Sequence, residues 1–190
     1  MRLNVYASID FAFSLGKRAD FSSIVVIGIS ADNDIYILDI DRFKTDRISE
    51  YYRHVKELHS KWDFKKLRAE VTVAQKIIVN DIKDSAKKEG LRLSVDEFRP
   101  VKSMGSKEER IAAALEPRYD NLQMWHYKGG YTNILEEELT QSRPAHDDIK
   151  DALASAVEIA IKPSQKRSSG LNTFKPSIGT NSRFGGVAFR

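Results

Sequence analysis

Acidic residues occur at three separated places where the local pattern predicts the end of a strand or the start of a helix. Asp10 follows one apolar segment, Glu70 lies in another, and Asp147 and Asp148 open the last helical segment. Carboxylate oxygens are the ligands that hard divalent cations such as Mg²⁺ and Mn²⁺ prefer. Two such ions about 4 Å apart can clamp an in-line attack on a phosphodiester. If the fold brings these acids together, they predict metal-assisted phosphodiester hydrolysis.

Each acid also has a purely structural interpretation. Asp10 suits the start of a turn, and Glu70 suits an exposed position on a short strand. Asp147 and Asp148 suit a helix N-terminus, where capping and the helix dipole favour acids, although one cap is enough. Sequence spacing alone does not show that the three places meet.

The first forty residues predict three strands, at 3–9, 23–29 and 35–40. Short polar turns join them, which is typical of an antiparallel meander. The middle segment, Ser-Ile-Val-Val-Ile-Gly-Ile, is almost continuously apolar. That pattern indicates a strand buried on both faces.

The rest of the chain alternates between helical and strand patterns. In order, it predicts a helix over 48–62, a strand over 67–71, a helix over 73–88, a strand over 91–95, a helix from Ser106 that Pro117 should end, a strand over 122–126, and helices over 131–139 and 146–161. A meander followed by this alternation predicts an α/β fold, a mixed sheet of five or more strands flanked by helices.

Charge and composition divide the chain into a body, residues 1–162, and a tail, residues 163–190. Six bases and no acids lie between Lys162 and Arg190, which leaves 25 bases and 27 acids in residues 1–161. The tail is rich in Ser, Gly and Asn, so we expect it to be disordered and to dock on DNA or another protein through its bases. The chain has no cysteine and no membrane-length apolar run, and its start lacks a signal-peptide pattern. We therefore expect a soluble intracellular protein.

Two pairs of bases are candidate DNA contacts. Lys107 and Arg110 lie three apart in the helix that follows Ser106, so they share a face and can contact phosphates. Glu108 and Glu109 beside them favour the alternative of a solvated surface. Lys17 and Arg18, in the first predicted turn, are the second pair.

Three further polar residues are candidates for supporting the acids. His146 can orient a ligand of the metal or simply precede the helix. Asp151 lies one helical turn beyond Asp147 and can assist the site or cap a neighbour. Asp20 is either a turn residue or an acid near the metals that does not bind them directly, and we favour the turn.

Four motifs in this order resemble the nuclease domain of viral large terminases, which package DNA. Ser8-Ile-Asp10 followed by the stretch from Ala19 to Ile27 is similar to the opening of that domain. Lys107-Glu-Glu-Arg110-Ile resembles its Lys-x-x-Arg-Ile helix, and Leu122-Gln-Met-Trp125 the strand after it. His146-Asp-Asp-Ile-Lys-Asp-Ala-Leu153 resembles the closing His-Asp-Asp-x-x-Asp-Ala-Leu signature.

The resemblance implies a ribonuclease-H-like fold and a two-metal endonuclease that cuts concatemeric double-stranded viral DNA. It implies Asp10, Asp147 and Asp148 as catalytic ligands of two Mg²⁺ or Mn²⁺ ions. Glu70 joins them as a predicted ligand through its place in the expected topology more than through a motif. The resemblance also implies work in the cytoplasm of an infected cell, with a terminase ATPase domain, a small terminase subunit and a portal or procapsid as partners, and no membrane.

The sequence departs from a whole large terminase in one respect. It contains no Gly-x-x-x-x-Gly-Lys-Ser/Thr phosphate loop, so we expect an excised domain or a split gene. Two alternatives remain open. One is a junction resolvase or transposase-type nuclease on the same fold, and the other is a non-catalytic DNA-binding or assembly module.

Overall fold

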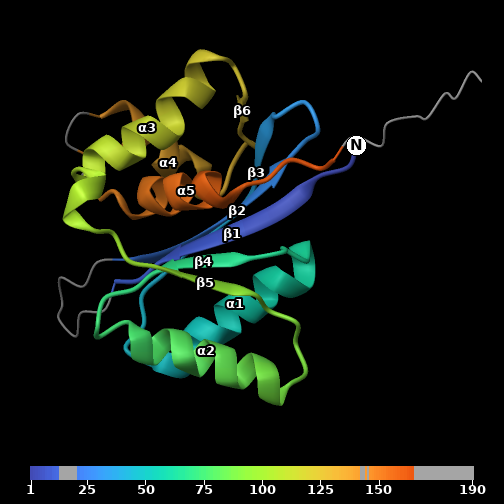
Figure 1. Ribbon diagram of the computed structural model, residues 1–190, viewed down its shortest axis with the longest axis vertical. Coiled ribbons are helices and arrows are strands. Elements are labelled where there is room, and N and C mark those ends of the chain that lie inside the picture. Colours follow the sequence, from blue (N-terminus) through green and yellow to red (C-terminus); the bar gives the residue numbers. More distant parts are fainter. Residues whose placement is uncertain (13–20, 142–143, 145, 165–190) are drawn as a thin grey trace, which may run out of the picture.

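The computed structural model describes residues 1–12, 21–141, 144 and 146–164 as three layers, with helices on both faces of a central sheet (Figure 1). The strands are β1 (Asn4–Asp10), β2 (Ser22–Ile29), β3 (Ile35–Phe43), β4 (Leu67–Glu70), β5 (Val95–Phe98) and β6 (Met124–Trp125). The helices are α1 (Ile48–Trp62), α2 (Lys76–Lys88), the short 3₁₀ helix η1 (Lys102–Met104), α3 (Lys107–Asp120), α4 (Thr132–Thr140) and α5 (Asp148–Ile159). Lys17, Arg18, Asp20 and the tail beyond Ser164 lie outside the described residues.

The sheet has six strands in the order β5-β4-β1-β2-β3-β6. β1, β2 and β3 pair antiparallel, which confirms the predicted meander. β4 pairs parallel with β1, β5 parallel with β4, and β6 parallel with β3. The mixed sheet flanked by helices confirms the predicted fold class.

β2 forms the centre of two hydrophobic cores. Ile24 and Val26 pack into the core on the α1 and α2 side of the sheet. Val25 and Ile27 pack into the core beneath α3, α4 and α5. Successive strand side chains point to opposite faces, so a strand buried on both faces must be apolar at every position. This confirms the interpretation of its continuous apolar run.

The prediction of a strand over 91–95 was wrong. The strand of this region, β5, is Val95–Phe98, so it begins where the predicted strand should end. Leu91 and Leu93 pack against the α1–α2 core from an irregular segment. The Leu91 amide donates to the Ala86 carbonyl at 2.8 Å, and this bond ties the segment to the end of α2. Burial explains the apolar pattern here, and strand pairing does not.

The prediction that Pro117 ends its helix was also wrong, because α3 continues to Asp120. Proline lacks an amide hydrogen, and inside a helix it costs about 3 kcal/mol. A contact beyond the helix opposes that cost, because the Tyr119 hydroxyl lies 2.9 Å from His126 Nε2. Leu122, with a φ of 55°, then turns the chain away from the helix.

The chain leaves the described fold beside the place where it enters. The Ile161 carbonyl accepts hydrogen bonds from Asn4 Nδ2 at 2.8 Å and from the Tyr6 hydroxyl at 3.3 Å. These bonds fix the segment after α5 against the beginning of β1. Asp10, at the other end of β1, lies at the opposite edge of the sheet.

Candidate active site

Two carboxylates meet at the carboxyl edge of the sheet because they end neighbouring parallel strands. Asp10 is the last residue of β1, and Glu70 is the last residue of β4. Ile9 is paired with Ala69, so the two acids follow adjacent positions in register. α5 packs across β1, β2 and β4 and brings its first turn to the same edge.

Asp151, on α5, is the third acid of this group. Burial is the main reason that the pKa of Asp10 is raised to about 7; the negative charges of Asp151, Glu70 and Asp148 add to the effect, and the positive charge of Lys107 opposes it. The pKa of Glu70 is raised first by burial and then by Asp151. Such raised values are expected where acids are crowded and withdrawn from water. The group Asp10, Glu70 and Asp151 is called here the acidic cluster.

Lys107 lies among these acids at the start of α3. Its Nζ is 3.0 Å from Asp151 Oδ2 and 3.2 Å from Asp147 Oδ2. Burial opposes its charge, but the attraction of Asp151 prevails and the pKa of Lys107 is raised. Ser106 fixes the position of Lys107, because Ser106 and Glu109 form a reciprocal capping box at the first turn of α3.

Arg110 lies one turn further along α3 and faces Glu70. Its Nη2 is 3.7 Å from Glu70 Oε2, too long for a good hydrogen bond. Glu70 Oε2 is buried and has no hydrogen-bond partner among the described residues. Glu70 therefore has an unused acceptor at the edge where Asp10 ends.

Asp148 lies beside the acidic cluster, in the lining of the same small cavity as Asp10, but it has a partner of its own. It forms a two-pronged ion pair with Arg42 of β3, from Nε to Oδ2 at 2.9 Å and from Nη2 to Oδ1 at 3.0 Å. Both side chains are buried, and the Ser23 hydroxyl donates to the Asp148 carbonyl at 2.7 Å. This contact anchors the first turn of α5 to the sheet. Asp147, by contrast, is 53% exposed at its side chain.

Glu138 of α4 supplies the helix cap that Asp147 does not. Asp147 is the N-cap residue of α5, but its side chain makes no capping bond. Instead Glu138 Oε2 accepts from the Lys150 amide at 2.8 Å. Burial raises the pKa of Glu138 to about 7, against the effect of that bond. Sequence reasoning missed Glu138 and Arg42, because no local pattern distinguishes them from other charged residues on their elements.

His146 is half-buried beside an aromatic residue at the edge of the site. Its ring meets the Phe21 ring edge-on at 5.6 Å, and the Arg42 guanidinium lies 3.7 Å from the Phe21 centroid. His146, Phe21, Asp10 and Lys107 line a cavity of about 230 Å³ together with Asp147 and Asp148. Five of the eight predicted site residues that the structure describes thus line one small hollow.

The acidic cluster fits a hard divalent cation by its chemistry. Its donors are carboxylate oxygens, Glu70 keeps a buried acceptor without a partner, and Asp10 carries a raised pKa that a cation would lower. Among the described residues, no group of three or more acidic or histidine side chains has the arrangement that holds a metal ion. Lys107 occupies the position between Asp147 and Asp151.

This sheet order, with acids ending the two central parallel neighbours, defines the class of ribonuclease-H-like domains. Residues 7–159 match the family described as terminase RNaseH-like domain. The chain therefore belongs to the nuclease domain family of terminases, which confirms the resemblance seen in its motifs. No curated protein sequence matches it.

Solved structures show the same fold at low sequence identity. The large terminase nuclease from thermophilic phage G20c is 18% identical, with a TM-score of 0.58 over 84% of this chain and 83% of that one. The same nuclease with bound zinc is 17% identical, with a TM-score of 0.56 over 84% and 82%. A fowlpox virus resolvase in complex with a Holliday junction is 12% identical, with a TM-score of 0.50 over 81% and 95%. Among the described residues, no helix combines the length and apolarity that crossing a membrane requires.

Proposed function

We propose that this chain is a divalent-metal-dependent endonuclease that cuts concatemeric double-stranded viral DNA for a large terminase. The observation that carries the proposal is the acidic cluster, three carboxylates from β1, β4 and α5 held at one edge of the sheet with Asp10 near a pKa of 7. Burying acids beside one another is unfavourable without a compensating charge. A site built at this cost suits cation binding.

Asp10, Glu70 and Asp151 would hold the cations, two Mg²⁺ or Mn²⁺ ions in this proposal, with the exposed Asp147 as a further ligand. When bound, such cations lower the pKa of water and neutralise the charge that develops on phosphate oxygens. This assignment moves one role relative to the sequence prediction. Asp151 takes the place of Asp148, because both oxygens of Asp148 already accept from Arg42.

Lys107 and Arg110 would serve the DNA and the acids together. Each lies within 4 Å of an acid of the cluster, so each offsets part of the negative charge there. Their positive charge also lies where a phosphate backbone must approach, and such contacts position DNA without selecting a sequence. Lys17 and Arg18, outside the described residues, remain proposed contacts of the same kind.

The remaining proposals follow from membership of the family. The nuclease would act in the cytoplasm of an infected cell, next to a terminase ATPase domain. A small terminase subunit and a portal or procapsid would complete the packaging assembly. The described residues contain the nuclease fold but no motor, so packaging itself would need these partners.

Cleavage of plasmid by the purified chain with Mn²⁺, and its loss with a chelator, tests the proposal. Asp10→Asn should remove cleavage, whereas the matched change Asp84→Asn, at an exposed acid on α2, should not. Linear duplex should be cut with little sequence preference. Clear preference for four-way junctions would instead indicate a resolvase, and full cleavage by Asp10→Asn would refute the site.

A further inference from the structure

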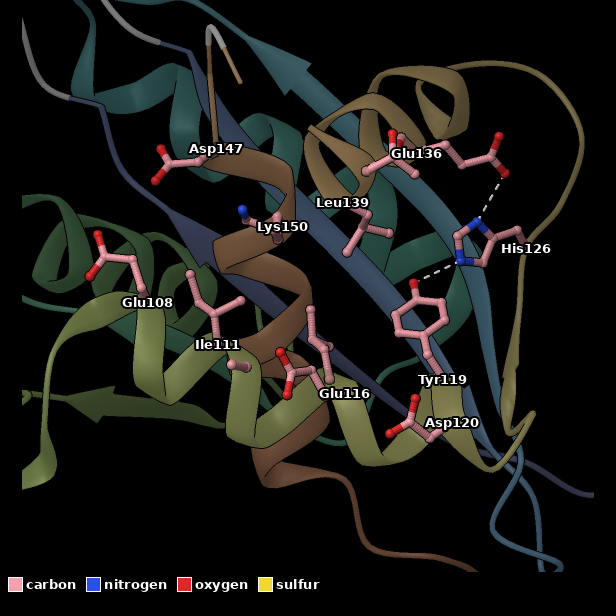
Figure 2. Close-up of a pocket in the computed structure, with 13 residues that line it drawn as sticks. Glu108, Ile111, Glu116, Tyr119, Asp120, His126, Glu136, Leu139, Asp147 and Lys150 are labelled. Atoms are coloured by element: carbon pink, nitrogen blue, oxygen red, sulfur yellow. Dashed lines mark hydrogen bonds and ion pairs between the residues drawn. The ribbon is translucent and has the colours of Figure 1, made fainter. Parts of the chain in front are cut away.

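A second hollow lies between α3, α4 and the start of α5. It has a volume of about 540 Å³, within the range of ligand pockets. Figure 2 shows Ile111 of α3 and Leu139 of α4 pointing into it, with Tyr119, His126 and Glu136 joined in a chain at one end and Asp147 at the other. Ile111 and Leu115 are almost fully buried, so they form an apolar floor. This hollow is called here the α3–α4 groove.

The groove is elongated along α3. Its lining includes residues of α3 from Glu108 to Asp120. Twelve helical steps correspond to about 18 Å, which is the length of five or six residues of extended chain. A groove of this length with an apolar floor suits an extended peptide that inserts two or three apolar side chains.

The rim of the groove is strongly acidic. Among the described residues that line it, five carry carboxylates and one, Lys150, is a lysine or arginine. The carboxylates are those of Glu108, Glu116, Asp120, Glu136 and Asp147. Such a rim repels the phosphates of DNA and attracts a basic partner. The chemistry of the groove therefore calls for a peptide that is both basic and apolar.

We propose that the α3–α4 groove binds residues 183–190 of this same chain. Their sequence is Arg-Phe-Gly-Gly-Val-Ala-Phe-Arg, with two arginines flanking Phe184, Val187 and Phe189 and no acid. The aromatic and valine side chains match the floor, and the arginines match the carboxylates on the rim. This goes beyond the proposed nuclease function and does not depend on it.

The segment can reach the groove without strain. The described chain ends at Ser164, just after the carbonyl of Ile161 that Asn4 and Tyr6 hold. Eighteen residues lie between position 164 and Arg183, which allows up to about 60 Å of extended chain. α5 itself spans only about 18 Å from its end back to its start beside the groove.

The docked segment would change the surface beside the acidic cluster. Asp147 lines both the α3–α4 groove and the small cavity that contains Asp10. Two arginines placed on this rim would offset part of the negative charge that DNA meets next to the cleavage site. The tail would then act on the surface of its own domain and not as a separate DNA-binding arm.

A spin label beside the segment tests the proposal in the full chain. The natural sequence has no cysteine, so Ser182→Cys gives a single attachment site. Amide signals from the groove face of α3 and from the end of α4 should lose intensity, while those of α1 and α2 keep theirs. The loss should disappear in about 1 M salt, where charges are screened beyond about 3 Å.

Charge reversal on the rim provides a matched comparison. Glu116→Lys with Asp120→Lys should abolish the intensity loss. Glu57→Lys with Asp84→Lys, two exposed acids on α1 and α2, changes the net charge equally and should preserve it. Intensity loss spread evenly over the surface, or unchanged by the rim variant, would overturn the proposal. A mixture of isotope-labelled chains and spin-labelled chains provides a second check. If the amide signals lose intensity only because of a spin label on another molecule, the occupant of the groove is a second copy and the proposal is overturned.

Discussion

Two groups of acids lie near the first turn of α5, and they differ in the partners that hold their oxygens. Asp148 has both oxygens paired with Arg42. Glu138 accepts from the α5 backbone through Oε2, although its Oε1 is buried without a partner among the described residues. Glu70 in the acidic cluster also keeps a buried oxygen without a hydrogen bond, and Arg110 lies 3.7 Å from it. Asp10 and Glu138 both have a pKa raised to about 7, so burial alone does not separate the two groups. A carboxylate that bonds to another element anchors structure, whereas Glu70 keeps its oxygen available to a ligand.

The largest expected effect lies in the acidic cluster. Asp10→Asn and Asp151→Asn should each lower the cleavage rate by at least about 10³-fold, because each removes a charge that a cation needs. Single-turnover cleavage with Mn²⁺ measures the loss, and circular dichroism checks the fold. Normal cleavage by Asp151→Asn together with abolished cleavage by a folded Asp148→Asn would reverse the roles we assign to these residues.

The next largest effect should come from breaking the anchor. Arg42→Met leaves the Asp148 carboxylate buried without its partner, which should destabilise the fold by about 3–5 kcal/mol. Adding Asp148→Leu removes the remaining charge and should restore much of that stability. Urea denaturation of the two single variants and the double variant measures the coupling. Additive losses in the double variant would show that the pair does not act as an anchor.

The pH dependence of stability sharpens the comparison further. The folded pKa of Asp10 is raised from 3.8 to about 7, and that of Glu138 from 4.5 to about 7. Each group therefore favours the folded state at low pH, and this contribution is lost as the pH rises through about 7. The free energy of unfolding should therefore decline between pH 4 and pH 8. Asp10→Asn and Glu138→Gln should each reduce this decline by on the order of 2 kcal/mol.

Magnesium distinguishes the two acids in the same measurement. Mg²⁺ should reduce the pH-dependent decline of stability that Asp10 causes, because it binds the Asp10 carboxylate. It should leave the decline that Glu138 causes unchanged. Equal effects of Mg²⁺ on the two variants would contradict the division between site and scaffold. Denaturation curves at each pH, with Mg²⁺ or with chelator, give the comparison directly.

The smallest expected effect concerns the cap of α5. Glu138→Ala should cost about 1 kcal/mol more than Glu138→Gln, because glutamine keeps an oxygen that can accept from the Lys150 amide. Melting temperatures measure the difference. Glu136→Ala, two residues earlier on the exposed side of α4, is the matched control and should change stability less. Equal melting temperatures for Glu138→Ala and Glu138→Gln would show that the capping bond contributes nothing.

The sequence was sufficient for the parts of the fold that depend on repeating patterns. The apolar run of β2 and the alternation after it predict a sheet covered on both faces. Asp10 and Glu70 could be predicted as neighbouring candidates because each ends a strand, and strand ends are recognisable from turn residues and changes in pattern. β5 was misplaced because residues that pack against a core without strand pairing have the same apolar character.

The proposed choice of Asp151 over Asp148 among the acids of α5 rests on the structure. Each step along a helix rotates the side chain by about 100°, so Asp148 points well away from Asp147, while Asp151 returns close to the same face. Which face meets the cluster depends on how α5 is rotated against the sheet. That rotation is fixed by Arg42, Ser23 and Glu138, which lie on other elements, so no local pattern in the last helix reveals it.

The bonds from Asn4 and Tyr6 to the Ile161 carbonyl have a mechanical consequence. Segments that connect this domain to anything else enter and leave at adjacent points, at the start of β1. A pull between those segments would load these two hydrogen bonds first. Asp10 lies six residues further along β1, about 20 Å away at the far edge of the sheet. A force between the two connecting segments would therefore act at the start of β1. It would leave the arrangement of the residues around Asp10, at the far end of the strand, undistorted.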